Sequence, residues 1–129
     1  MKLKMFLYMF LISGFVSAQI SFTAKVSKKQ LGVNERLRVD FTMNTDGDDF
    51  EPPSFENFTV VGGPSQSINN SWVNGVRSFS KSYSYFLAPK KRGKFTIGQA
   101  TIEIGGETYK TLPIKITVTA AIDKPKDPN

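Results

Sequence analysis

Residues 79–118 read FSKSYSYFLAPKKRGKFTIGQATIEIGGETYKTLPIKITV. Apolar side chains recur there at every second position, in short runs that proline and glycine residues separate. The runs comprise Phe79, Tyr83, Tyr85 and Leu87, then Phe95 and Ile97, then Ile102 and Ile104, and finally Ile114, Ile116 and Val118. A period of two places alternate side chains on one face of a strand, and proline and glycine favour turns. The stretch therefore predicts a series of short antiparallel strands.

The residues before this stretch extend the pattern toward the N-terminus. Residues 20–26 and 37–43 alternate apolar and polar side chains, so each run predicts a strand. An apolar run at residues 55–61 ends at the Gly-Gly-Pro sequence of residues 62–64. Residues 65–73 are mostly polar, with an isoleucine, a tryptophan and a closing valine, and they form a further candidate strand.

Turn signals divide the chain and set the class of fold. Loops are predicted at the polar residues 27–34 and at residues 44–54, where two consecutive prolines stop a strand. The Asn-Gly pair at residues 74–75 is a strong signal for a two-residue hairpin. After residue 18 no run has the helical period. About seven to nine short strands in roughly 100 residues predict an all-β, immunoglobulin-like antiparallel β-sandwich, with a small open β-barrel as the alternative.

The N-terminus has the features of an export signal. Lys2 and Lys4 precede an apolar run, and the small residues Ser17 and Ala18 close it. This run is shorter than the about 20 residues that span a membrane, so residues 1–18 predict a cleaved signal peptide. We expect an exported protein of the cell envelope, with the sandwich at residues 19–119. Residues 120–129 contain two prolines and predict a linker or a truncated tail, and no membrane anchor is expected beyond the signal peptide.

The composition argues against catalysis and against a nucleic-acid partner. Cysteine and histidine are both absent, which removes the commonest general base and the commonest metal ligands. No nucleophile elbow, phosphate loop or metal triad is present, so neither an enzyme nor a cofactor is expected. The formal net charge of +6 falls to +4 without residues 1–18, which is mild for an exported chain.

Five residues are candidates for binding a partner. Asp46, Asp48, Asp49 and Glu51 form the acidic cluster of the chain, and Trp72 is its single tryptophan. Closely spaced carboxylates suit Ca²⁺, but the spacing of an EF-hand is missing. A solvated loop that uses Asp and Gly for turn geometry is the simpler interpretation, and calcium binding is left open.

Two segments together resemble the N-terminal part of the BatD family. They are PPSFENFTVVGGP at residues 52–64 and LAPKKRGKFTI at residues 87–97, and the likeness covers residues 20–119. BatD proteins are oxygen-tolerance proteins of Bacteroidetes and other Gram-negative bacteria. The resemblance implies several immunoglobulin-like domains in the periplasm, followed by a membrane-spanning helix. It therefore implies that this chain is a fragment or a truncated copy of such a protein.

The resemblance also implies a function and a partner. BatD proteins are encoded with MoxR-type ATPases and von Willebrand factor A proteins and are implicated in aerotolerance and envelope stress. We therefore expect a periplasmic protein-interaction module whose envelope partner carries a von Willebrand factor A domain. Such a domain usually holds a metal ion that takes an acidic ligand, which the acidic cluster would supply. The alternative is an exported glycan-binding or adhesin module in which Trp72 and loop phenylalanines stack on sugar.

Overall fold

The computed structural model describes residues 19–123, and these residues form β-strands and no α-helix. The predicted signal peptide, residues 1–18, lies outside the described residues, as do residues 124–129. No helix among residues 19–123 has the length and apolar character needed to cross a membrane. The strands are β1 (Phe22–Val26), β2 (Gln30–Gly32), β3 (Leu37–Met43), β4 (Asp48–Glu51), β5 (Phe58–Val73), β6 (Val76–Pro89), β7 (Gly93–Ile97), β8 (Thr101–Ile104), β9 (Glu107–Lys110) and β10 (Ile114–Thr119).

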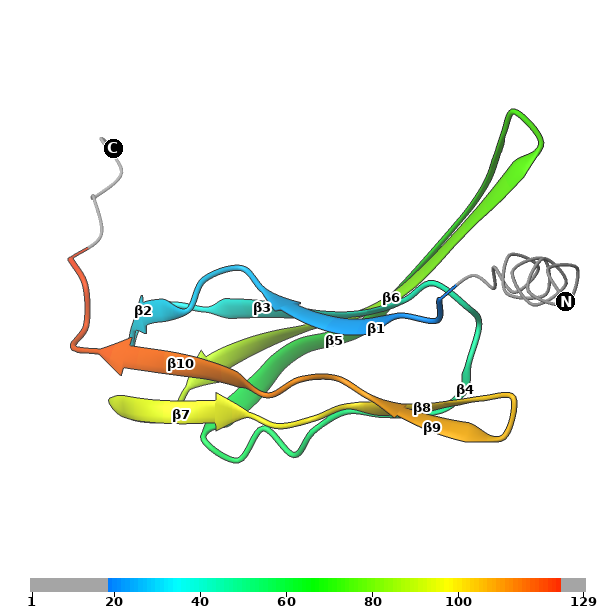
Figure 1. The fold of residues 1–129 in the computed structure, drawn as a ribbon. Coiled ribbons are helices and arrows are strands. Elements are labelled where there is room, and N and C mark those ends of the chain that lie inside the picture. The colour runs from blue at the N-terminus through cyan, green and yellow to red at the C-terminus, as the bar shows by residue number, and fades with distance from the viewer. Residues whose placement is uncertain (1–18, 124–129) are drawn as a thin grey trace, which may run out of the picture.

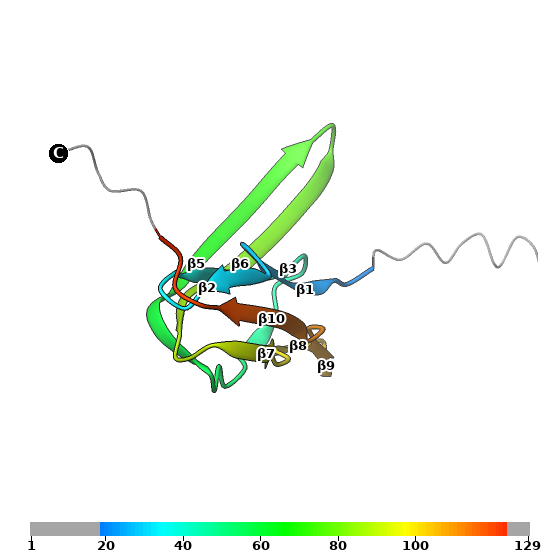
Figure 2. The same ribbon diagram turned by 90° about the vertical axis from the view of Figure 1, so that its left-hand side faces the viewer.

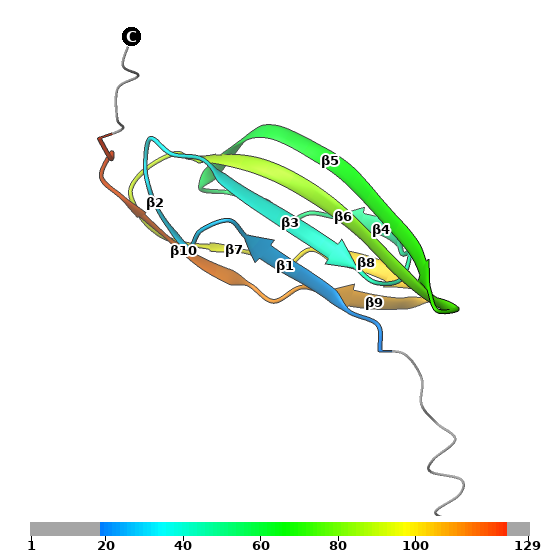
Figure 3. The same cartoon turned by 90° about the horizontal axis from the view of Figure 1, so that it is seen from above.

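The strands pack as two layers. One layer is a four-stranded sheet in the order β1-β3-β6-β5, and all its neighbours are antiparallel. The other layer consists of two three-stranded sheets, β2-β10-β7 and β4-β8-β9, which follow one another along the molecule (Figures 1 and 3). This confirms the all-β, immunoglobulin-like sandwich. None of these sheets closes into the barrel that was the alternative.

The core lies between the layers and follows the alternation in the sequence. Alternate residues of β3 are buried, and their neighbours on the strand are half-buried or exposed. Each buried apolar side chain of this size contributes about 1.5–3 kcal/mol relative to exposure. The fully buried large side chains are Leu31, Leu37, Val39, Phe41, Met43, Leu87, Ile97, Ile102 and Ile116.

Two predicted loops contain strands. Strand β2 lies within residues 27–34 and pairs in parallel with β10, which buries Leu31 against Val118. Strand β4 lies within residues 44–54 and pairs with β8. Both predictions were wrong for the same reason. Local composition disfavours these strands, and the pairing that forms them comes from residues far along the chain.

Strand β5 does not end at the Gly-Gly-Pro sequence, as the sequence predicted. Its register against β6 shifts between Val60 and Gly62 and again between Gly62 and Ser65. Gly63 has a φ of +90°, and a Cβ there would collide with the carbonyl oxygen of Ser84. Glycine tolerates this conformation, so the strand bulges and then continues to Val73.

The outer part of the β5–β6 hairpin extends beyond the sandwich. Strand β3 ends at Met43, opposite Lys81, so residues 76–80 of β6 pair with β5 and not with β3. Figures 1 and 2 show the two strands projecting away from both layers. We call residues 68–81 the arm. Its tip is a two-residue turn with φ of 52° at Asn74 and 77° at Gly75, and this confirms the hairpin that the Asn-Gly pair predicted.

Candidate interaction surface

The arm exposes large apolar side chains. Ile68, Trp72, Val73 and Val76 are between 59% and 69% exposed. They come from both strands and both sides of the turn, so they gather in one short segment of the molecule. Single exposed apolar residues are common on protein surfaces, but a group of them in one place marks a contact site.

The two faces of the arm differ in chemistry. Residues directly opposite one another in an antiparallel pair share a face. On one face Trp72 lies opposite Arg77, and Ile68 lies opposite Lys81. The other face presents small polar pairs, including Ser71 opposite Ser78, and the apolar pair Val73 and Val76 beside the turn.

The apolar face continues the core face of the sandwich. From Arg77, steps of two residues along β6 lead through Phe79 and Lys81 to Tyr83 and the buried Tyr85. We call this side of the arm the inner face. It consists of Ile68, Asn70, Trp72, Arg77, Phe79 and Lys81. The inner face is therefore the part of the four-stranded sheet's core side that the second layer leaves uncovered.

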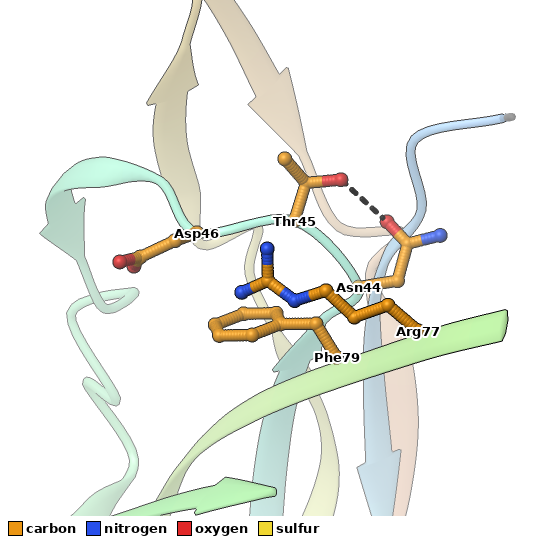
Figure 4. A pocket seen from close by; sticks show the side chains of 5 residues that line it. All are labelled: Asn44, Thr45, Asp46, Arg77 and Phe79. Atoms are coloured by element: carbon orange, nitrogen blue, oxygen red, sulfur yellow. Dashed lines mark hydrogen bonds between the residues drawn. The ribbon is translucent and has the colours of Figure 1, made fainter. Parts of the chain in front are cut away.

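An open hollow of about 410 Å³ lies beside the inner face. Its walls are Arg77 and Phe79 from β6 and residues 44–46 from the turn after β3 (Figure 4). The guanidinium carbon of Arg77 lies 5.8 Å from the centre of the Phe79 ring, a cation–π distance. Arg77 Nε also donates a hydrogen bond of 3.1 Å to Asn70 Oδ1. The hollow thus combines a cation, an aromatic ring and the carboxylate of Asp46.

An ion pair joins the base of the arm to the same turn. Lys81 Nζ donates to Asp46 Oδ1 at 3.2 Å and lies 5.5 Å from the centre of the Tyr83 ring. Burial alone lowers the pKa of Lys81, but hydrogen bonds and charge interactions with Tyr83 and Asp46 outweigh it and raise that pKa above its ordinary value. Lys81 is therefore held in its charged form at the point where the arm leaves the sandwich.

The structure divides the predicted acidic cluster. Asp46 belongs to the hollow, whereas Asp48, Asp49 and Glu51 lie along β4. There Asp48 is opposite Glu103 of β8, and the register shifts before Glu51. Among residues 19–123, no group of three or more His, Cys, Asp or Glu residues has the arrangement to hold a metal ion.

Trp72 lies near the tip of the arm, opposite Arg77, and Arg77 lines the hollow together with Asp46. Two of the three carboxylates of β4, Asp49 and Glu51, line a separate depression, together with Phe50 and residues of β8 and β9. The structure therefore brings Asp46 and Trp72 to one end of the molecule and places the other acidic candidates on the sandwich.

Several residues of this surface were missed from the sequence. Val76 and Arg77 were not candidates, and Phe79 was grouped with the strand residues of the core. A signal for them exists, because residues 57–76 contain no charged side chain and include the hairpin turn. An uncharged run that crosses a turn is unusual for an exposed segment.

These features define an immunoglobulin-like β-sandwich domain with a projecting hairpin. Residues 24–118 match the family model described as a BatD DUF11-like domain. The chain belongs to the BatD family, and the resemblance stated from the sequence is confirmed. No curated protein and no solved structure matches the chain.

Proposed function

We propose that this chain is a non-enzymatic protein-interaction module of the periplasm, serving a BatD-type system of oxygen tolerance and envelope stress. Its membership of the BatD family supports the biological setting. The N-terminal signal in the sequence supports export from the cytoplasm. The absence of histidine and cysteine from the sequence is in keeping with binding rather than catalysis.

The observation that carries the proposal is the exposed apolar arm. A two-stranded ribbon on its own is marginally stable in water, and this one also exposes Trp72 to 69%. Tryptophan and arginine are the side chains that most often dominate binding energy at protein interfaces. The inner face presents one of each as a direct cross-strand pair, Trp72 and Arg77. The arm is therefore the proposed contact surface.

The proposed partner is an envelope protein with a von Willebrand factor A domain. In such domains a bound metal ion accepts a carboxylate ligand from the binding partner. The exposed carboxylates of β4, Asp48, Asp49 and Glu51, are the proposed donors. Asp46 is a weaker choice for this role because Lys81 already engages its carboxylate.

A binding measurement with purified proteins tests the proposal. A von Willebrand factor A protein of a BatD-type system is titrated by calorimetry with the wild type and with a double variant, Ile68→Ser and Trp72→Ser. The double variant is expected to weaken binding by about tenfold or more, since each lost hot-spot side chain removes over 1 kcal/mol. Leu112→Ser is the matched control, because Leu112 is an exposed apolar residue outside the arm. Equal affinity of the wild type and the double variant would refute the role of the arm.

A second titration separates the metal ligand from the arm. Replacing Asp48 and Asp49 by Asn and Glu51 by Gln keeps the side-chain shapes and removes their charges. Binding that becomes independent of Mg²⁺ in this variant supports the carboxylates as ligands. Unchanged binding that still requires Mg²⁺ excludes them.

A glycan ligand is the alternative function, and one feature favours it. Trp72 presents an exposed ring with the amide of Asn70 two residues away on the same face. Aromatic rings flanked by amides suit stacking and hydrogen bonding to sugars. A glycan array with the purified chain tests this, and a signal that disappears in Trp72→Ser would establish it in place of the protein partner.

A further inference from the structure

Strand β5 has a free edge along the arm. It is the outermost strand of the order β1-β3-β6-β5, and no other strand among residues 19–123 pairs with its outer side. In a two-residue hairpin the pair next to the turn, here Val73 and Val76, exchanges backbone hydrogen bonds, and bonded pairs then alternate along the strands. The backbone N–H and C=O groups of Ile68, Asn70 and Trp72 therefore face away from β6.

This edge lacks the usual protection against strand pairing. Proteins commonly place charged residues on edge strands to prevent association. Every other edge strand of four or more residues in the described chain carries charge, as Lys25 does in β1, Lys94 in β7 and Glu107 in β9. Strand β5 carries none, although the whole chain is rich in lysine and arginine. A net-positive chain with a neutral edge strand is able to meet a copy of itself there without charge repulsion.

We propose that two copies of the chain pair edge to edge through β5, antiparallel about a two-fold axis at Asn70. In this register Asn70 of one copy lies opposite Asn70 of the second copy, and the paired segment is residues 67–73. Trp72 then lies opposite Ile68 of the second copy, and the reverse pair forms on the other side of the axis. Both exposed apolar residues of the inner face are thereby paired with each other.

A neighbouring register is less favourable. An axis at Asn69 also aligns outward-facing backbone groups, but it places Trp72 opposite Gln66 and Ile68 opposite Asn70. The axis at Asn70 therefore combines backbone pairing with apolar side-chain contact. The result is a four-stranded ribbon made of two arms, and more than two strands with an apolar face is the condition for a stable sheet.

The pairing extends the proposed function and rests on that function, because the dimer joins two inner faces into one surface for recognising the partner. The two proposals fail separately. A chain that is monomeric and still binds the von Willebrand factor A protein refutes the pairing alone. A chain that dimerises and fails to bind that protein refutes the proposed function alone.

Sedimentation of the purified product of the full 129-residue sequence tests the pairing. The wild type is expected to be a concentration-dependent dimer. Asn70→Lys and Asn70→Glu each place like charges opposite one another at the axis, and each is expected to raise the dissociation constant by about tenfold or more. An equimolar mixture of the two variants is expected to restore the dimer, which also shows that both variants fold. A wild type that stays monomeric at about 1 mM overturns the proposal, because dimerisation would then be worth less than about 4 kcal/mol. A dimer that neither variant weakens overturns it as well.

Asn69→Lys is the matched control for the register. Asn69 is next to Asn70 on the opposite face, and at the proposed axis it lies opposite Ser71 of the second copy. The dimer is expected to survive this change. Since the chain contains no cysteine, oxidation of Asn70→Cys adds a covalent check. Opposite residues in a bonded pair have Cα atoms about 5.5 Å apart, within disulfide range, whereas Asn69→Cys would place the two sulfurs out of reach. Cross-linking through residue 69 rather than residue 70 contradicts the axis.

Discussion

Lys81 Nζ lies 3.2 Å from Asp46 Oδ1, and this pair fixes the base of the arm to the turn between β3 and β4. The Lys81 side chain is only 13% exposed, whereas the Asp46 side chain is 69% exposed. The lysine therefore lies at the boundary between the covered and the uncovered parts of the inner face. Its ammonium group stays charged there because it makes an ion pair with the Asp46 carboxylate and a cation–π contact with the Tyr83 ring.

Removing this ion pair is expected to have a small effect on folding. Asp46→Asn should lower the free energy of unfolding by less than about 1 kcal/mol, because one partner is well exposed to solvent. The difference should vanish in about 1 M NaCl, where charges are screened within about 3 Å. Urea unfolding at both salt concentrations measures it. Asp48→Asn is the control, and an Asp46→Asn loss that persists in high salt would show that packing, not charge, is responsible.

Phe50 is expected to be the residue that holds β4 to the sandwich. Its ring stacks on Tyr83 with centroids 4.1 Å apart and an interplanar angle of 7°, and the Phe41 ring lies at 5.7 Å. Phe50→Ala should lower the free energy of unfolding by about 2–4 kcal/mol, through lost burial and a cavity. Urea unfolding checks this, with Leu112→Ala expected within about 0.5 kcal/mol of the wild type because its side chain is exposed. A loss for Phe50→Ala as small as that of the control would place Phe50 outside the core.

The sequence is a good guide to the sandwich where a strand is buried on one side. Strand β3 and the inner half of β6 alternate in the sequence, and the same alternation appears in their burial. Strand β4 was missed because its sequence is acidic and its pairing residue Glu103 is far along the chain. Phe50, the apolar residue of β4, is half-buried against rings of β3 and β6, and the local sequence of β4 gives no sign of those distant rings.

The arm was harder to predict than the sandwich for a geometric reason. An arm forms where β5 and β6 extend beyond the end of their neighbour β3. The last β3–β6 pair, Met43 opposite Lys81, is that point. Strand length in each segment is readable from sequence, but the relative alignment of distant strands is not. Trp72 and Asp46 were therefore found as single residues, while their places at the tip and at the base of the arm were not predicted.

Glycine-to-alanine substitutions should give a larger loss of stability at the bulge in β5 than at the turn at the tip of the arm. Gly63→Ala is expected to cost roughly 2–4 kcal/mol, because the new methyl group meets the backbone of Ser84 and Tyr85 in a left-handed conformation. Gly75→Ala should cost only about 1–2 kcal/mol. The φ of Gly75 is also positive, but nothing lies within 4 Å of the position that an added Cβ would take. Thermal or urea unfolding gives both values. Equal losses would mean that the backbone conformation alone, without the collision, sets the cost at residue 63.

The buried phenol of Tyr85 is expected to make folding less stable at alkaline pH. Burial, with a smaller contribution from the charge of Tyr83, raises the pKa of Tyr85 above its ordinary value of 10.0. As the pH rises past 10.0, the unfolded chain releases this proton before the folded chain does, so folding becomes less favourable. The free energy of unfolding should therefore decline more steeply above pH 10 for the wild type than for Tyr85→Phe, and urea midpoints at several pH values measure it. Parallel curves for the two proteins would contradict the buried, neutral phenol.

Trp72 makes the arm visible in solution, because it is the single tryptophan of the chain. Its ring is 69% exposed, so a dilute solution should emit at nearly the wavelength of tryptophan in water, with little further change on unfolding in urea. Pairing through β5 places Ile68 of the second copy against the ring, and the emission should then move to shorter wavelength as the protein concentration rises. The Asn70→Lys variant should lack this concentration dependence while keeping the emission of the dilute wild type. Emission at short wavelength in the dilute variant would mean that Trp72 packs against its own sandwich, and the arm would then not be free to bind.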